Sequence, residues 1–272
     1  MRGTSAASLR ELTSTAERLF ASDGEQSLTD VAADLFGVEA VIDSSNQAVR
    51  LLSDPGREFE IKQSAVRSLF ADRIGHAALE LTLEAVARRW SEQQDLLDAL
   101  ETLGVVALLH RADSEDALVR VEEELFQFSR IIGQSAELSE AFDAARERPE
   151  ERRRIARTLL EGRAHPLTEL LAAQAVGRLS DVKPAQRVLE LAELASERRR
   201  RLLAVVTSAR ELSDAQSERL SRILASIYGR EVQMNLEVEP DVVGGLRIQV
   251  GDDQIDASVL ARLEQARARL VA

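Results

Sequence analysis

The chain has 272 residues, of which 44% are apolar, so it is long enough for two or three domains with cores of their own. Its formal net charge of −12 argues against a nucleic-acid surface or an anionic lipid surface, since both bind clustered basic residues. It contains no cysteine, which excludes disulfides, thiol chemistry and the usual zinc sites.

No targeting or membrane-spanning segment is expected. The first residues, Met1 to Ser5, lead into a polar helical pattern and not into the apolar core of a signal peptide. No stretch approaches the roughly 18 uninterrupted apolar residues that a membrane-spanning helix needs.

An internal repeat organises the larger part of the chain. A shift of 90 positions places residues about 14–70 on residues about 104–160. The matched pairs are apolar or helix-boundary positions: Leu19 with Leu109, Leu28 with Leu118, Val31 with Val121, Leu35 with Leu125, and Ser45 with Ser135. If one residue is deleted, His76 aligns with His165 and Leu81 with Leu170. The constant offset predicts a duplicated structural unit.

Within each copy, apolar residues recur at helical spacing. In the first copy such stripes run through residues 9–20, 28–42, 66–70 and 79–90. Clusters of Asp, Gly and Pro interrupt the pattern in both copies, for example at Asp54-Pro55-Gly56 and at Pro149. Several short helices joined by turns form a compact bundle. We therefore predict two tandem helical bundles, in residues 1–92 and 93–200.

After Arg201 the pattern becomes that of strands. Residues 202–208 form a β-branched run, and residues 232–238 and 246–250 alternate apolar and polar side chains, so three strands are predicted. Ser213 and Gln216 form a capping-box signature that opens a helix after the first strand. Asp252-Asp253 suits a turn, and a final helix begins near Ser258. The fold class is therefore mainly α, with a small α+β domain of order β-α-β-β-α in residues 201–272.

The sequence offers no motif for catalysis or metal binding. His76, His110 and His165 form no close-spaced ligand pair, and His76 and His165 are expected to cap helices or lie on the surface. The Gly244-Gly245 pair lacks the Lys and Ser/Thr of a phosphate loop, so a turn or bulge with positive φ explains it better. We expect no catalytic residue, no metal and no cofactor, although catalytic residues can also be distant in sequence.

The segment from Leu236 to Ser258 resembles the C-terminal signature of the ATP synthase delta subunit family. The resemblance covers a strand, an acid, a small-small pair with glycine, a second strand, Gly-Asp, and an Ile-Asp-x-Ser helix start. The residues that carry it are Val238, Asp241, Gly244, Gly245, Ile248, Gly251, Asp252, Ile255, Asp256 and Ser258. Upstream, residues about 94–200 resemble the family's six-helix bundle. Residues about 5–92 resemble a second copy of that bundle, a feature associated with actinobacterial members.

The resemblance implies a non-catalytic stator subunit of an F-type ATP synthase, which supports proton-driven ATP synthesis. The implied partners are the N-terminal helices of the alpha subunits and the b-type stalk subunits, with no nucleic acid and with a membrane only indirectly. The implied location is peripheral, on the cytoplasmic face of the cell membrane. By family analogy an alpha helix docks in a trough between the first and fifth helices of a bundle. In the second copy that trough would be lined by Leu103, Val106, Leu109, Leu170, Ala173 and Val176.

Two other functions compete with this interpretation. One is a regulatory or scaffold protein whose α/β domain binds a metabolite, which would require convergent polar groups in a pocket. The other is a helical scaffold unrelated to ATP synthase, which would leave the C-terminal signature unexplained. For each residue of the predicted trough, an ordinary core position is the competing interpretation.

Overall fold

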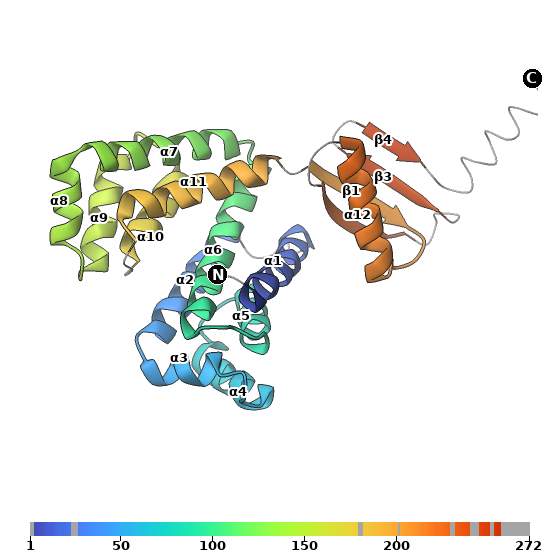
Figure 1. Ribbon diagram of the computed structural model, residues 1–272, viewed down its shortest axis with the longest axis horizontal. Helices are drawn as coiled ribbons and strands as arrows, with labels where there is room; N and C mark the ends of the chain where they lie inside the picture. Colours follow the sequence, from blue (N-terminus) through green and yellow to red (C-terminus); the bar gives the residue numbers. More distant parts are fainter. Residues whose placement is uncertain are drawn as a thin grey trace, which may run out of the picture. The chain divides into compact units, whose positions relative to one another are not determined.

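The computed structural model describes residues 3–22, 27–178, 182–200, 202–228, 232–239, 245–250 and 253–256. The chain forms two compact units, Met1–Ala195 and Ser196–Ala272 (Figure 1). The first unit is helical, and the second combines one described helix with a sheet. This confirms the predicted fold class. Within the described residues, no helix is both long enough and apolar enough to cross a membrane.

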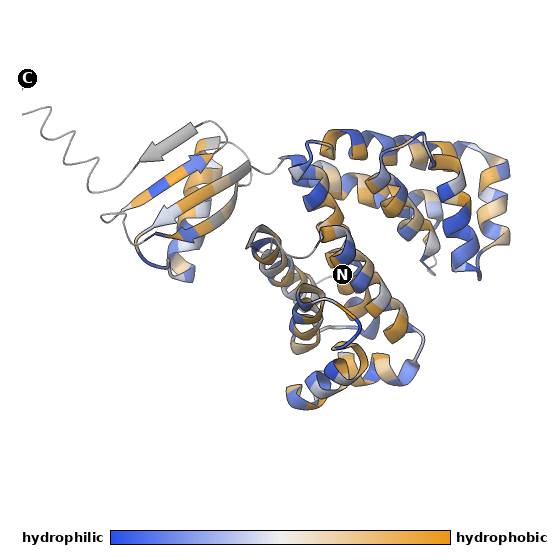
Figure 2. Cartoon of the chain, turned by 180° about the vertical axis from the view of Figure 1, so that it is seen from behind, coloured by the Kyte–Doolittle hydropathy of each residue, from blue (hydrophilic) through white to orange (hydrophobic). Residues whose placement is uncertain are grey.

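Eleven helices are described in the first unit and its continuation into residue 200. The first copy contains α1 (Thr4–Ser22), α2 (Leu28–Asp43), α3 (Asn46–Ser53), α4 (Phe59–Phe70) and α5 (His76–Ala87). The second copy contains α6 (Gln93–Ser114), α7 (Leu118–Gln134), α8 (Ala136–Ala144), α9 (Pro149–Leu160) and α10 (Pro166–Gly177), and α11 (Pro184–Arg200) follows. Blue and orange residues alternate around most of these helices in Figure 2, as expected for amphipathic helices that share a core.

The helix starts confirm the predicted repeat. α2, α3, α4 and α5 each begin 90 residues before α7, α8, α9 and α10 respectively. The predicted one-residue deletion is wrong, because the offset of 90 continues through α5 and α10. Leu81 is therefore equivalent to buried Leu171 and not to exposed Leu170.

Two carboxylates and two serines occupy equivalent positions and make equivalent hydrogen bonds. Ser45 and Ser135 cap α3 and α8, accepting from Ala48 N at 3.3 Å and from Leu138 N at 3.2 Å. Asp34 on α2 accepts from the backbone N–H of Gly75 at 2.8 Å, and Glu124 on α7 accepts from that of His165 at 2.7 Å. In both copies the second helix thus satisfies a free N–H at the start of the fifth helix.

A buried cation repeats in the same way at the other end of the fifth helix. Lys62 on α4 donates to the carbonyl of Val86 at 3.2 Å, and Arg152 on α9 donates to the carbonyl of Val176 at 3.5 Å. Desolvation by burial lowers the pKa of both cations. Each donates to one of the last carbonyls of the fifth helix, which have no partner within the helix. The duplication therefore preserved polar contacts as well as apolar positions.

Replacing Glu124 with Gln is expected to destabilise the protein by ~1–2 kcal/mol at pH 7. Burial raises the pKa of Glu124, but hydrogen bonds from His165 N, Thr168 and Arg120 outweigh burial and hold that pKa below its ordinary value. A depressed carboxyl pKa adds stability above the unfolded-state pKa, and this stability is lost as pH falls through the folded-state pKa. The difference in melting temperature between wild type and E124Q, measured from pH 7 to pH 3, should therefore shrink as pH falls. An unchanged difference would contradict the assignment.

Helix α6 lies at the centre of the first unit, and it packs on helices of both copies. It contacts α1, α2, α3 and α5 from the first copy, and α7 and α10 from the second. Most of its side chains are buried, and buried residues occur on every side of the helix. Its start lies 89 residues after that of α1 and 91 residues before that of α11, so it corresponds to both helices. α6 thus closes the first bundle as its sixth helix and opens the second as its first.

The second unit contains β1 (Leu202–Ser208), α12 (Asp214–Tyr228), β2 (Val232–Val238), β3 (Leu246–Val250) and β4 (Asp253–Asp256). The strand order is β2-β1-β3-β4, with β1 parallel to β2 and antiparallel to β3. The bounds of β1, β2 and β3 confirm the predicted strands. Ser213 N donates to Gln216 Oε1 at 2.9 Å, which confirms the predicted capping interaction at α12.

One strand differs from the prediction. The sequence pattern places Asp253 in a turn and Asp256 at the start of the last helix, but residues 253–256 pair with β3 in an antiparallel register. Ladder hydrogen bonds to β3 satisfy a backbone that local propensity alone would place in a turn. The predicted final helix lies outside the described residues.

Candidate docking surfaces

One side of α6 faces α1 of the first copy. Asp95 Oδ2 accepts from the hydroxyl of Ser5 at 2.6 Å. About four turns further along α6, His110 Nδ1 lies 2.8 Å from Glu17 Oε2, and the imidazole meets the ring of Phe20 edge-on at 5.8 Å. These contacts define the face of α6 that α1 covers over its whole length.

The predicted trough residues of α6 lie on or beside this covered face. Leu103 and Val106 precede His110 by seven and four residues, so they share its side of the helix. Leu103, Val106 and Leu109 are at most 8% exposed. On α10, Ala173 and Val176 are also buried, whereas Leu170 is 38% exposed. In this structure five of the six residues are core, and only Leu170 offers substantial surface to a partner. Their role in partner binding stays a prediction.

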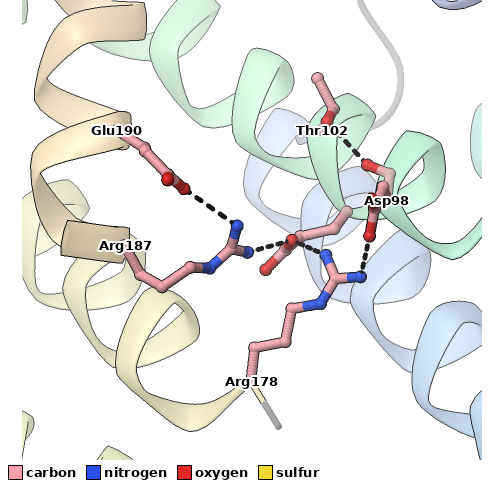
Figure 3. Close-up of polar contacts among 6 residues, drawn as sticks. Asp98, Thr102, Arg178, Arg187 and Glu190 are labelled. Atoms are coloured by element: carbon pink, nitrogen blue, oxygen red, sulfur yellow. Dashed lines mark hydrogen bonds and ion pairs between the residues drawn. The ribbon is translucent and has the colours of Figure 1, made fainter. Parts of the chain in front are cut away.

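A different side of α6 carries a cluster of charged residues (Figure 3). Arg178, at the end of α10, donates to Asp98 Oδ1 and to Glu101 Oε2. Arg187, on α11, donates to the same Glu101 oxygen at 2.5 Å and to Glu190 Oε2 at 3.1 Å. Thr102 donates to the carbonyl of Asp98 at 2.7 Å. Glu101 and Arg178 are both buried, so the pair is weakly screened by solvent.

The cluster borders a cavity of about 430 Å³ between α1, α6 and α11. Apolar side chains line the rest of the cavity: Ala6 and Leu9 from α1, Val105 from α6, and Leu191 and Leu194 from α11. The three arginines at its wall, Arg10, Arg178 and Arg187, are matched by Asp98, Glu101 and Glu190. The balanced charge gives no preference for an anion or a cation.

Glu39 of α2 belongs to the same charged region. Burial raises the pKa of its carboxyl, and the nearby Arg178 opposes that shift. Arg153 of α9 also lowers this pKa, while Asp43 and Asp98 raise it. Glu39 therefore brings a first-copy carboxylate close to arginines of the second copy.

In the second unit, α12 presents an exposed stripe. Ile223 is 46% exposed and Ile227 is 61% exposed. With Arg219, Arg222 and Ser226 they surround a shallow surface hollow. Leu224, the residue after Ile223, is buried against the sheet. The stripe is thus apolar and basic in an otherwise acidic protein.

The signature residues that the structure describes have different environments. Ile248 is buried against α12, whereas Val238, at the end of edge strand β2, is half exposed. Gly245 has φ +89°, which confirms the predicted positive φ. Ile255 and Asp256 lie in β4, opposite Ile248 and Arg247. Asp241, Gly244, Gly251, Asp252 and Ser258 lie outside the described residues.

The histidines occupy the expected kinds of positions. His165 is the N-cap of α10, its Nδ1 accepting from Leu167 N at 3.3 Å, which confirms the predicted capping role. His76 begins α5 and lies 3.6 Å from Glu80 on the surface. It is equivalent to Pro166, so the predicted equivalence to His165 is wrong. Across the described ranges, no three His, Cys, Asp or Glu side chains are grouped to hold a metal ion.

Known proteins resemble this chain over its length. The model of the ATP synthase delta (OSCP) subunit family matches residues 105–270. The ATP synthase subunit delta of Beutenbergia cavernae is 41% identical over 271 residues, covering 99% of both chains. That of Acidothermus cellulolyticus is 40% identical over 273 residues, again covering 99% of both. The ATP synthase subunit b-delta of Mycobacterium sp. strain KMS is 36% identical over 270 residues, which cover 99% of this chain and 61% of that protein.

Proposed function

Because the chain belongs to the ATP synthase delta (OSCP) subunit family, we propose that it links the alpha/beta catalytic head of an F-type ATP synthase to the b-type peripheral stalk. It is a non-catalytic subunit, whose role is to keep the head from turning with the rotor. The end-to-end match to delta subunits carries this proposal. A static link requires rigid elements, which the continuous core of the helical unit supplies.

The chain is proposed to have three functional parts. Residues 1–92 carry the first bundle, which α6 completes, residues 93–200 carry the second bundle, and residues 201–272 form the unit that binds the stalk. Because α6 packs on helices of both copies, the two bundles act as one body. The subunit is proposed to lie peripherally on the cytoplasmic face of the membrane, held there through the complex.

The proposed partner of the second bundle is the N-terminal helix of an alpha subunit. Leu170 supports this proposal, because it is an exposed leucine on the fifth helix of that bundle. The proposed partner of the C-terminal unit is the end of a b-type subunit. The exposed Ile223 and Ile227 suit an amphipathic helix. The relative whose name joins b and delta also supports a b-type partner.

Binding of two synthetic segments to the purified full chain tests the proposal. One segment is the N-terminal helix of the alpha subunit from the same organism, and the other is the C-terminal helix of its b subunit. Leu170→Glu should weaken alpha binding about tenfold or more and leave b binding unchanged. Ile227→Glu should do the reverse, so each variant serves as the control for the other. If neither segment binds the wild-type chain, the proposed linking role is wrong.

A further inference from the structure

The connection between α10 and α11 is fastened at both ends to a single carboxylate. Arg178 stands at the last turn of α10, and Arg187 lies in the first turns of α11. Both guanidinium groups donate to Oε2 of Glu101 on α6. Figure 3 shows that Arg178 and Arg187 come from different elements and point toward one another. The end of α10 and the start of α11 are therefore both hydrogen-bonded to Glu101 of α6.

The setting makes these contacts strong positional constraints. The side chains of Glu101 and Arg178 are each only 7% exposed, so water competes weakly for either group. Charge-assisted hydrogen bonds to a guanidinium are directional, and removing one partner leaves the other buried without compensation. Asp98 and Glu190 bind the outer edges of the two arginines, which further limits their rotation.

The first copy holds its corresponding connection to the first helix with serine hydroxyls, because Arg88, the equivalent of Arg178, pairs with Glu84 of its own helix at 3.2 Å. The hydroxyl of Ser5 on α1 accepts from Ser91 N at 2.7 Å, and that of Ser8 donates to the carbonyl of Arg89 at 2.9 Å. These serines hold the segment between the fifth and sixth helices to the first helix. In the second copy, Arg178, Arg187 and Glu101 hold the corresponding connection, and α11 is the helix that follows it. α11 continues past Ala195, where the second unit begins.

We propose that Glu101 is a positioning residue, which fixes the direction in which α11 leaves the second bundle and so stiffens the helix that leads to the C-terminal unit. Glu101 does this by holding Arg178 and Arg187 together. Its contribution to coupling rests on the proposed stator function. The geometric part concerns only the first unit and can be tested separately.

Distances between spin labels on the full-length chain test the geometric part. The chain has no cysteine, so introduced pairs can be labelled selectively. Exposed Ser14 on α1 and Glu193 on α11 form the reporting pair, and Ser14 with exposed Gln127 on α7 forms a pair that does not involve α11. Glu101→Gln should broaden the distance distribution of the first pair about twofold and leave the second pair unchanged. An equally narrow distribution in E101Q would overturn the proposal.

Two further variants keep this test decisive. Glu115→Gln removes an exposed carboxylate at the C-cap of α6, where it pairs with Arg111, and should broaden neither pair. If E101Q does not fold, Arg187→Gln removes the α11 contact while Arg178 keeps Asp98 and Glu101. It should broaden the first pair alone, and an unchanged distribution would again overturn the proposal.

Membranes that carry the assembled complex test the mechanical consequence. E101Q should lower ATP-driven proton pumping per ATP hydrolysed by about half, with hydrolysis itself unchanged, whereas E115Q should leave the ratio at the wild-type value. Broadened distances with unchanged pumping would overturn the coupling role of Glu101. In that case the proposed linking function would still stand if the alpha and b segments bind the full chain. Failure of the Glu101 proposal can therefore be distinguished from failure of the proposed function.

Discussion

A chain that begins at residue 93 is expected to be insoluble or poorly folded, although it keeps every helix of the second bundle. The deletion removes α1, α2 and α5, which cover most of the surface of α6. Leu97, Leu100 and Leu108, which share the side of α6 that faces Phe36 of α2, would become exposed. Each leucine moved from core to water costs about 1.5–3 kcal/mol, and a stripe of them promotes aggregation.

The complementary fragments provide the control. Residues 1–114 retain α6 and should fold cooperatively, since the side of α6 left exposed carries Asp98, Glu101 and Thr102. Residues 1–92 lack α6 and should not fold. Circular dichroism melts and sedimentation of the fragments 93–272, 1–114 and 1–92 test these expectations. A monomeric 93–272 fragment with a sharp melt would show that the bundles fold separately.

The sequence carries a signal for this sharing of α6. Between Leu96 and Leu109 apolar residues occur on most sides of the helix and only Asp98, Glu101 and Thr102 are charged or hydroxylic, which indicates a helix that is buried on more sides than an ordinary amphipathic one. The 90-residue period locates the helix starts, because caps and apolar stripes are local features. The period cannot show that one helix belongs to both copies, because that depends on packing between residues far apart in sequence. The packing of α1 on α6 is likewise not visible in the sequence, so the predicted trough falls on a face of α6 that α1 covers.

The charged cluster around Glu101 is beyond prediction from sequence. Arg178 lies 77 residues from Glu101, and Arg187 lies 86 residues from it. Neither arginine belongs to a local motif, and nothing in the sequence around either of them indicates a partner on α6. The sequence also does not show that Glu101 is buried, because a glutamate between leucines of a helix can equally lie on the exposed side.

The C-terminal unit was predicted better than the helical unit in one respect and worse in another. β1, β2 and β3 have the predicted bounds, because alternation of side chains is a local property. β4 escaped prediction, since Asp253 and Asp256 have low strand propensity and only pairing with β3 makes them extended. The exposed Ile223 and Ile227 lie on the same predicted helical stripe as Leu224, so periodicity alone does not distinguish outward residues from core ones.

Adding a single methyl group at Gly104 is expected to separate α2 from α6. A Cβ atom there would lie 2.4 Å from Cε1 of Phe36, and two further ring atoms would lie within 2.9 Å. The ring packs against the hydrophobic core, which limits its movement away from α6. Overpacking of this kind costs about 1–3 kcal/mol, which exceeds the ~0.5–1 kcal/mol that Ala gains over Gly within a helix. Gly104→Ala should therefore lower the melting temperature by several degrees.

A matched substitution separates this clash from helix propensity. At Gly37, next to Phe36 on α2, an added Cβ would meet no atom within 4 Å, so Gly37→Ala should raise the melting temperature. Replacing the ring with Phe36→Leu should make Gly104→Ala nearly neutral, a non-additivity that a double-mutant cycle measures. If Gly104→Ala stabilised the protein as Gly37→Ala does, the close approach of α2 and α6 would be wrong. The two copies would then not share α6 as one rigid body, and the link between head and stalk would need its stiffness from elsewhere.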